Sequence, residues 1–324
     1  MRRAALGCIM LLVALGASAI EVSRGDIRLR LHESSARFSV DLRVGGEWKA
    51  LLYPEDPRTS ALDVREDNRV HRMGDSGRFR QFVLQTEEEV GFIWTSGSLR
   101  VEQLFRFTRA PASDRADALQ MTITVTNTGE QPLETAVRLL LDTYLGERSN
   151  VHFVTPSASG FTREARLDPG PAVPYVASVP DAESDYGLQV MLYGEGVTRA
   201  EAAVLANWRR LFNSSWQYDA NDGRNYNRLP YSINDSAMLV LYGGQRIPPG
   251  AQYSVVTYLG NLSVRGYLPP GAAAVVQEDD RLLDRLARVI LRINALLDDP
   301  DVDPAEVDRL QAELDELSSL VRGR

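Results

Sequence analysis

Cysteine is almost absent from this chain of 324 residues, since Cys8 is the only one. It lies within residues 1–19, which have the three parts of a secretory signal peptide: a basic start, an apolar run and the small residues Ala17-Ser18-Ala19. The apolar run is shorter than the roughly 20 residues that span a bilayer. We therefore expect a protein exported to the periplasm or the exterior. Its mature chain would have no disulfide, no thiol nucleophile and no cysteine metal site.

Lysine and long apolar runs are also scarce. Lys49 is the only lysine among 36 basic residues, and the formal net charge is −8. An acidic exported protein is a poor partner for nucleic acid or anionic lipid. No apolar run after residue 19 approaches bilayer length, so no membrane span is expected after signal cleavage.

Catalytic and metal-binding motifs are missing as well. The three histidines, none of them at metal-ligand spacing, are His32, His71 and His152. Residues 299–303 carry three aspartates, but Pro304 and Leu310 stand where a calcium loop needs glycine and glutamate. We therefore predict no cofactor and no metal site.

The histidines offer little for general acid–base chemistry. The pattern places His32 at a surface position of a strand and His71 in a polar loop. His152 is the strongest candidate for a general base, because it closely follows Asp142-Thr143-Tyr144-Leu145-Gly146. No catalytic residue is assigned on this basis.

Apolar residues recur at every second position from about residue 26 to residue 260. Ile27, Leu29 and Leu31 show this alternation, as do the runs 38–44, 99–107 and 119–125. A period of two buries one face of an antiparallel strand and leaves the other in solvent. Ten or more such strands without alternating helices predict a mainly β protein with a large antiparallel sandwich.

Turn residues divide these strands, and some later runs are apolar throughout. Gly45-Gly46 suits a two-residue hairpin turn that needs positive φ. Residues 188–193, 237–242 and 253–259 are expected to form more deeply buried strands. The segment 198–210 opens with a helix-capping pattern and is compatible with a helix or a strand; we favour the strand.

The hydrophobic period changes after Pro269-Pro270-Gly271. Apolar residues then recur at spacings of three and four in two segments, the pattern of helices packed side by side. The first segment has Leu283, Leu286, Ile290, Ile293 and Leu297, and the second has Val307, Leu310, Leu314, Leu317 and Val321. Asp303-Pro304-Ala305-Glu306 is a suitable helix start.

Charge predicts that these two helices pair with each other. The first is rich in arginine and the second in aspartate and glutamate, so we expect an antiparallel hairpin. Two interpretations follow: the hairpin caps the sandwich, or it docks another protein or a second copy of the chain. The residues predicted to bind such a partner are Leu283, Leu286, Ile290, Ile293, Val307, Leu310, Leu314 and Leu317.

Aromatic residues are concentrated in residues 207–235, where they alternate with asparagine and aspartate. Flat rings beside short polar side chains suit a sugar-binding surface, because the rings stack on apolar sugar faces and the polar groups bind hydroxyls. The same composition also stabilises a long loop. The candidate ligand-binding residues are Trp208, Trp216, Tyr218, Asp219, Asn225, Asp235 and, outside this stretch, Asp142.

Residues 121–129, MTITVTNTG, followed by Gln131-Pro132-Leu133, resemble the strand–turn–strand of galactose-mutarotase-like proteins. The resemblance implies a large antiparallel supersandwich and activity on sugars. Where epimerases of that family have a histidine motif, this chain has Leu140-Leu141-Asp142-Thr143, so no catalytic histidine carries over. The segments 138–147, 206–219 and 229–260 are also similar to uncharacterised exported bacterial β-sandwich proteins, which implies a fold but no activity.

The expected organisation is a signal peptide (1–19), an antiparallel sandwich (20–268), a Pro/Gly linker (269–275) and a helical hairpin (276–322). The leading functional hypothesis is a non-catalytic envelope protein that binds a protein partner, or itself, through the hairpin. The alternative is a carbohydrate-binding or mutarotase-like protein that uses the aromatic stretch.

Overall fold

The computed structural model describes residues 19–272, 278–297 and 303–322. Most of the predicted signal peptide, the end of the predicted linker and the acidic connection 298–302 lie outside these residues. The described chain is mainly β, with large antiparallel sheets followed by two C-terminal helices, so the predicted fold class is confirmed. None of its described helices combines the length and the apolar character required to cross a bilayer.

The strands form three antiparallel sheets. The four-stranded sheet contains, in spatial order, β1 (Ala19–Arg24), β2 (Ile27–His32), β3 (Arg37–Val44) and β4 (Glu47–Ala50). The six-stranded sheet contains β14 (Ala165–Leu167), β17 (Ala202–Asn207), β18 (Ser236–Ile247), β11 (Leu133–Asp142), β5 (Ala61–Glu66) and β6 (Arg69–Arg72). The nine-stranded sheet contains β13 (Ala158–Ser159), β12 (Val154–Thr155), β15 (Tyr175–Ser178), β16 (Leu188–Met191), β19 (Gln252–Gly260), β10 (Ala118–Asn127), β9 (Leu99–Thr108), β8 (Val90–Thr95) and β7 (Arg80–Gln85).

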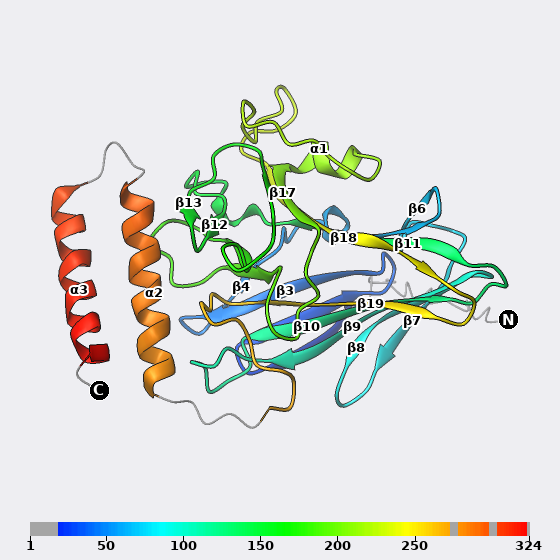
Figure 1. Cartoon of the computed structure of the whole chain (residues 1–324), viewed down its shortest axis with the longest axis horizontal. Helices are drawn as coiled ribbons and strands as arrows, with labels where there is room; N and C mark the ends of the chain where they lie inside the picture. Colours follow the sequence, from blue (N-terminus) through cyan, green and yellow to red (C-terminus); the bar gives the residue numbers. More distant parts are fainter. Residues whose placement is uncertain (1–18, 273–277, 298–302, 323–324) are drawn as a thin grey trace, which may run out of the picture.

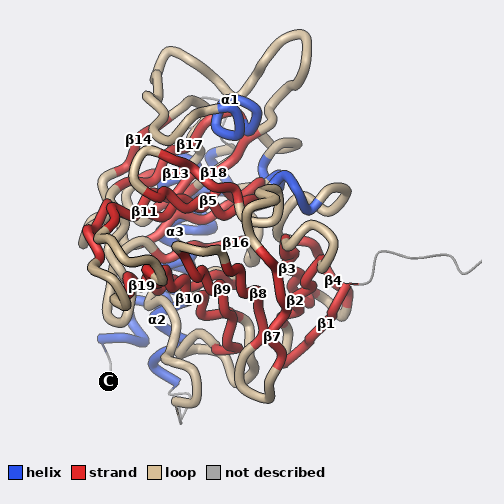
Figure 2. Tube along the Cα trace, turned by 90° about the vertical axis from the view of Figure 1, so that its right-hand side faces the viewer, coloured by secondary structure: helices blue, strands red, loops and turns tan. Residues whose placement is uncertain are grey.

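The six-stranded and nine-stranded sheets lie face to face, and the four-stranded sheet lies beside them (Figure 2). Alternate residues of the facing strands meet in one apolar core, with Ile123 of β10 and Leu139 of β11 both fully buried. Leu29 of β2 joins the same core. The period-two runs therefore bury the faces that the alternation predicts. The turn at Gly45-Gly46 joins β3 to β4 with both residues at positive φ, as expected.

The six-stranded sheet is covered on its outer face too, which explains its continuous apolar runs. Leu140 and Leu239 point away from the main core and form a second cluster with Leu211 of the short helix α1 (Trp208–Asn213). Strands buried on both faces lose the alternation of polar residues. The segment 198–210 thus contains the favoured strand, β17. The strand ends at Asn207, and the helix α1 begins at the next residue, Trp208.

The two C-terminal helices, α2 (Glu278–Leu297) and α3 (Pro304–Arg322), form an antiparallel hairpin. Their interface buries Leu310 and Leu317 of α3 against Val289 of α2. The predicted charge pairing is present, because Arg285 Nη2 lies 2.9 Å from Glu313 Oε1. The α2 residues that pack in this interface are Leu282, Leu286, Val289, Ile293 and Leu296.

The predicted seam of α2 is therefore wrong at two positions: Leu283 and Ile290 are 39% and 41% exposed. The apolar stripe of α2 is wide enough to contain two overlapping seams, and α3 covers only one of them. Leu286, Ile293, Leu310, Leu314 and Leu317 do pack between the helices. The side chains of Leu297 and Val321 lie outside the described residues.

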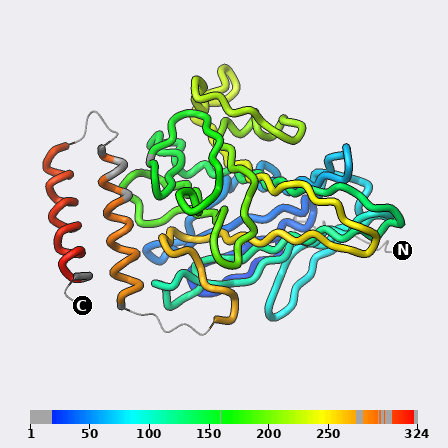
Figure 3. The backbone as a smooth tube through the Cα atoms, viewed as in Figure 1, coloured from blue at the N-terminus to red at the C-terminus, as the bar shows by residue number. Residues whose placement is uncertain are grey.

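Helix α2 lies against the end of the sandwich, and α3 lies on the outer side of α2 (Figures 1 and 3). Asp284, which is almost fully buried, accepts a hydrogen bond of 3.1 Å from the Val264 amide. Arg288 Nη1 donates to the Asp185 carbonyl at 2.9 Å, and Arg265 pairs with Asp280. The hairpin thus caps one end of the sandwich through α2, while much of α3 faces solvent.

Candidate functional site

Three carboxylates converge where the six-stranded sheet meets its loops. Asp142 ends β11, Glu147 follows the 3₁₀ turn η2 (Tyr144–Gly146), and Asp235 precedes β18. Their carboxylate oxygens lie within 4.8 Å of one another. Asp142 pairs in register with Ala237, so the antiparallel pairing of β11 and β18 brings the ends of two distant segments together. We call these three residues the carboxylate cluster.

Burial raises the pKa of every member of the carboxylate cluster. The pKa of Glu147 is raised to about 7, by burial first and by the nearby Asp235 charge second. Burial is also the largest cause of the raised pKa values of Asp142 and Asp235. At neutral pH the cluster can therefore hold protons and present both a proton donor and a proton acceptor.

The same oxygens could instead ligate a cation, since one oxygen from each residue would be available. Carboxylate oxygens are the ligands that hard divalent cations prefer. A bound proton and a bound cation both relieve the repulsion among like charges. A protonated cluster and a cation-bound cluster differ in how the free energy of unfolding responds to pH and to added metal.

A first cleft, of about 750 Å³, opens on the Glu147 side of the carboxylate cluster. We call it the tyrosine cleft, because Tyr53, Tyr144 and Tyr186 line it. The rings of Tyr53 and Tyr144 meet edge to face, with their centroids 6.0 Å apart. Tyr53 Oη donates to Glu55 Oε2 at 3.0 Å, so this aromatic wall carries acceptor groups beside the rings.

A second cleft, of about 400 Å³, opens on the Asp235 side and is lined by Trp208, Tyr231, Arg209 and Arg228. We call it the tryptophan cleft. The indole of Trp208 packs against Phe212 in a tilted arrangement, with ring centroids 5.0 Å apart, and its Nε1 donates to the Thr59 carbonyl at 2.8 Å. Tyr231 is 79% exposed at the cleft rim.

The buried Asn207 places the elements of the tryptophan cleft. Its Oδ1 caps α1 by accepting from the Arg209 and Arg210 amides. Its Nδ2 donates to the carbonyls of Tyr226 and Asp235 at 2.7 and 3.0 Å. One side chain therefore fixes the start of α1 against the segment that carries Asp235.

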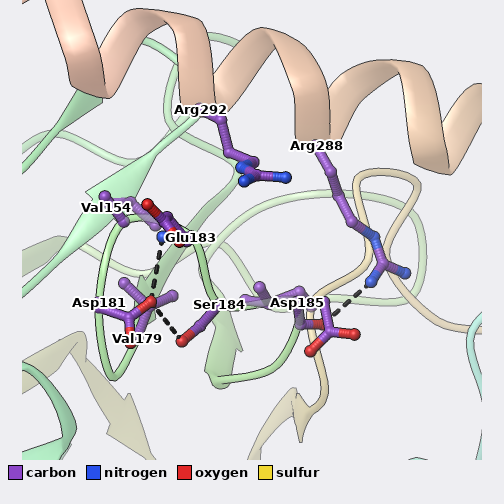
Figure 4. Close-up of a pocket in the computed structure, with 10 residues that line it drawn as sticks. Val154, Val179, Asp181, Glu183, Ser184, Asp185, Arg288 and Arg292 are labelled. Carbon is purple, nitrogen blue, oxygen red and sulfur yellow. Dashed lines mark hydrogen bonds between the residues drawn. The ribbon is translucent and has the colours of Figure 1, made fainter. Parts of the chain in front are cut away.

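The loop 179–185 is a wall shared by the tyrosine cleft and a smaller cavity under α2. Pro180 and Asp181 line the cleft, while Val179 and Ala182 line the cavity. Asp181 Oδ1 stabilises the loop by accepting from the Glu183 amide and the Ser184 hydroxyl, and Arg288 of α2 holds its far end at Asp185 (Figure 4). The C-terminal hairpin thus supports one wall of the tyrosine cleft.

The structure brings together only some of the predicted ligand-binding residues. Trp208, Asp235 and Asp142 lie at the tryptophan cleft or in the carboxylate cluster. Trp216 instead packs over the guanidinium groups of Arg65 and Arg138, at 5.2 and 5.6 Å, and lines neither cleft.

The remaining predicted residues are also placed elsewhere. Tyr218 Oη donates to the buried carboxylate of Glu164 at 2.9 Å, which ties the loop to the sandwich. Asp219 is exposed, and Asn225 lines a third cleft. These polar and aromatic side chains mainly stabilise the long loop, which is the second interpretation of this composition.

The histidines occupy structural positions. His152 is fully buried, its Nδ1 lies 2.8 Å from Ser236 Oγ, and its ring contacts Tyr226. Burial lowers its pKa to about 4, so it is neutral at pH 7. The loop position predicted for His71 is wrong: it lies in β6, where it bonds Glu66 Oε2 at 2.9 Å, because the strand pairs with β5.

Sequence reasoning missed Glu147 and the tyrosines of the first cleft. The available signal was local: Asp142 ends a buried strand, and Tyr144 and Glu147 follow within five residues. Tyr53 and Tyr186 come from segments far away along the chain, so only the folded arrangement reveals them.

No family model matches the chain, and no curated protein matches it. Solved structures of similar fold include a galactose mutarotase-related enzyme from Lactobacillus acidophilus, at 10% identity and a TM-score of 0.40, covering 78% of this chain and all of that one. A putative aldose 1-epimerase from Escherichia coli K12 is similar at 10% identity and a TM-score of 0.38, with 76% and 99% covered.

A polysaccharide lyase is similar at 12% identity and a TM-score of 0.41, covering 83% of this chain. The chain spans about a third of that protein, since the match covers 35% of it. Galactose-mutarotase-like proteins are thus among the solved structures that this chain resembles, and the likeness is one of fold alone.

Proposed function

We propose that this protein binds carbohydrate in the tyrosine and tryptophan clefts, outside the cytoplasm. The observation that carries the proposal is that Glu147 of one cleft and Asp235 of the other meet in the carboxylate cluster. Aromatic faces on both sides of convergent carboxylates match the two surfaces of a sugar ring, one apolar and one covered with hydroxyls.

The sizes of the clefts support the same function. Volumes of about 750 and 400 Å³ lie within the range of small-molecule sites. Each cleft contributes one carboxylate to the cluster, so the two clefts approach each other there. The raised pKa of Glu147 means that a neutral carboxyl is available to donate a hydrogen bond at neutral pH.

The two tryptophans of the aromatic stretch provide a test. We expect galactose, glucose or their oligosaccharides to change the tryptophan fluorescence of the full chain saturably. Trp208→Ala should abolish this signal, and Tyr231→Ala, at an exposed position, should weaken the affinity by about tenfold through loss of one ring contact.

Trp216→Ala is the matched control, because this tryptophan packs on arginines outside both clefts. It should leave the affinity within about twofold, although loss of its cation–π contacts lowers stability. If no sugar of the panel saturates the parent protein, or if Trp216→Ala alone removes binding, the proposal is wrong.

Protein docking through the hairpin is a second candidate function. The exposed Leu283 and Ile290, seven residues apart, lie on one face of α2 and pack neither in the interface with α3 nor among the sandwich contacts described above. Such an apolar strip is suited to a second copy of the chain or to another protein.

For self-association, light scattering on the full chain gives the test. The double variant Leu283→Ser/Ile290→Ser should shift an oligomer to a monomer, because both apolar contacts are removed. Phe82→Ser, at a 52% exposed position on β7, is the control and should not change the mass. A parent protein that is monomeric at high concentration excludes self-association through this strip.

A further inference from the structure

A third cleft, of about 510 Å³, has a different chemistry from the first two. Its lining includes three arginines, Arg163, Arg210 and Arg224, together with Asn150, Asn225 and Asn234. No carboxylate is among the described residues that line it. This is an unusual local composition in a chain whose formal net charge is −8. We call it the arginine cleft.

A carboxylate behind the cleft, that of Glu164, pairs with two of these arginines and already accepts several hydrogen bonds. Glu164 is fully buried at its side chain and accepts from Arg210 Nη1 at 2.7 Å. It also accepts from Tyr218 Oη at 2.9 Å and from the Asn221 amide at 3.1 Å. The single charge of Glu164 is therefore shared between Arg210 and Arg224.

Two of the guanidinium groups keep donors available. Arg163 is exposed, and its Nη1 makes two long hydrogen bonds, of 3.4 Å each, to the Asp222 and Gly223 carbonyls. Arg224, whose side chain is 48% exposed, lies 3.9 Å from Glu164 and donates to Tyr218 Oη at 3.2 Å. Guanidinium forks with free N–H groups recognise carboxylate, sulfate and phosphate in a bidentate manner.

The backbone around the arginine cleft is fixed in advance. Arg163 and Asn225 form a β-bridge, and the Glu164 amide donates to the Arg224 carbonyl at 2.8 Å. Arg210 is held by three hydrogen bonds, to Glu164 and to the Asn225 and Asn227 carbonyls. A preformed site loses little conformational freedom when a ligand binds.

We infer that the arginine cleft binds an oxyanion: a carboxylate, sulfate or phosphate group, held by Arg163 and Arg224 with the asparagine side chains as neutral partners. Asn234 directly precedes Asp235 of the carboxylate cluster, so an anionic group bound here lies beside the proposed sugar site. The inference stands without the proposed function, because it rests on the cleft's own charges.

Calorimetric titration of the full chain with inorganic sulfate, inorganic phosphate, glucuronate and neutral glucose tests the inference. We expect saturable binding of at least one anion that Arg163→Gln weakens by about tenfold, since one charged hydrogen-bonding partner is removed. Arg224→Gln should have a similar effect. Arg199→Gln, at an exposed arginine paired with the exposed Asp168, should have none.

Each outcome decides a separate point. Tighter binding of glucuronate than of the inorganic ions assigns the site to an acidic sugar, whereas the reverse order assigns it to a free anion. Absence of anion binding, or equal weakening by Arg199→Gln, overturns the inference. Neutral-sugar binding that Trp208→Ala removes and Arg163→Gln leaves intact supports the proposed function separately.

Discussion

Replacing Asp63 by alanine should cost about 3–5 kcal/mol of unfolding free energy, because it leaves a buried arginine without its counter-ion. Asp63 and Arg138 are both 1% exposed at their side chains, and Arg138 Nε lies 2.9 Å from Asp63 Oδ2. Arg72 bonds the other carboxylate oxygen at 2.9 Å. The three residues are cross-strand neighbours on β11, β5 and β6.

This ion triad also holds the aromatic stretch on the sheet. Arg138 Nη1 donates to the Ser214 and Trp216 carbonyls, and Arg72 donates to the Phe212 carbonyl at 3.1 Å. Loss of Asp63 therefore weakens the loop and the sheet together. Equilibrium unfolding in urea gives the free energy.

Two variants make this prediction specific. Asp168→Ala removes an exposed ion pair and should cost less than about 0.5 kcal/mol. Asp63→Leu/Arg138→Met removes both fully buried charges and should be more stable than Asp63→Ala, since the only arginine of the triad that then lacks its carboxylate is Arg72, whose side chain is 19% exposed. Equal stability of Asp63→Ala and Asp168→Ala would contradict the argument.

The contribution of the carboxylate cluster to stability should fall as the pH rises from about 4.5 to about 7, opposite in sign to the contribution of His152, whose lowered pKa favours the folded state as the pH rises. The folded protein keeps a proton on Glu147, whose pKa is about 7, while the unfolded chain releases it near 4.5. A group with a raised folded-state pKa stabilises the fold below its unfolded pKa, and this contribution is lost through the window between the two values. Asp142 and Asp235, with pKa values raised by the same burial, act in the same direction.

The size of this pH-dependent contribution to stability can be bounded from the pKa of Glu147, and a variant of Glu147 is the control. A pKa raised from 4.5 to about 7 corresponds to an upper limit of about 3 kcal/mol, and solvent around the half-buried Glu147 lowers that figure. Glu147→Gln stays neutral and can keep the acceptor for the Ser236 amide, so the stability of the parent relative to this variant should fall over this window.

Urea unfolding from pH 4 to pH 8, with and without calcium, distinguishes protons from a cation in the carboxylate cluster. If the parent and Glu147→Gln lose stability equally with pH, Glu147 does not carry the proton. If calcium raises the stability of the parent at pH 8 and not that of Glu147→Gln, a cation can replace the protons there.

In the C-terminal helices, hydrophobic periodicity predicts the elements and their pairing but not the face of α2 that contacts α3. Spacings of three and four predict both helices and their pairing, because a helix places such residues on one face. The choice between two overlapping seams on α2 depends on the sandwich, which occupies another face of the helix through Asp284 and Arg288. Leu283 and Ile290 are exposed for that reason.

The candidate site shows a similar division. The sequence indicated Trp208, Asp235 and Asp142 from their residue types, but it grouped them with Trp216 and Tyr218, which serve the loop. Chemistry of side chains is local, whereas a cleft is made by segments that meet in three dimensions. Tyr53 and Tyr186 join Glu147 only because distant strands are neighbours.

By itself the sequence determined the mainly β sandwich and the helical hairpin. The spacing of apolar residues, every second residue or every third and fourth, distinguishes a half-buried strand from a half-buried helix. Tertiary structure alone decided which carboxylates meet. Asp142, Glu147 and Asp235 converge because β11 and β18 pair in a fixed register, and no local pattern encodes a distance between two remote ends of chain.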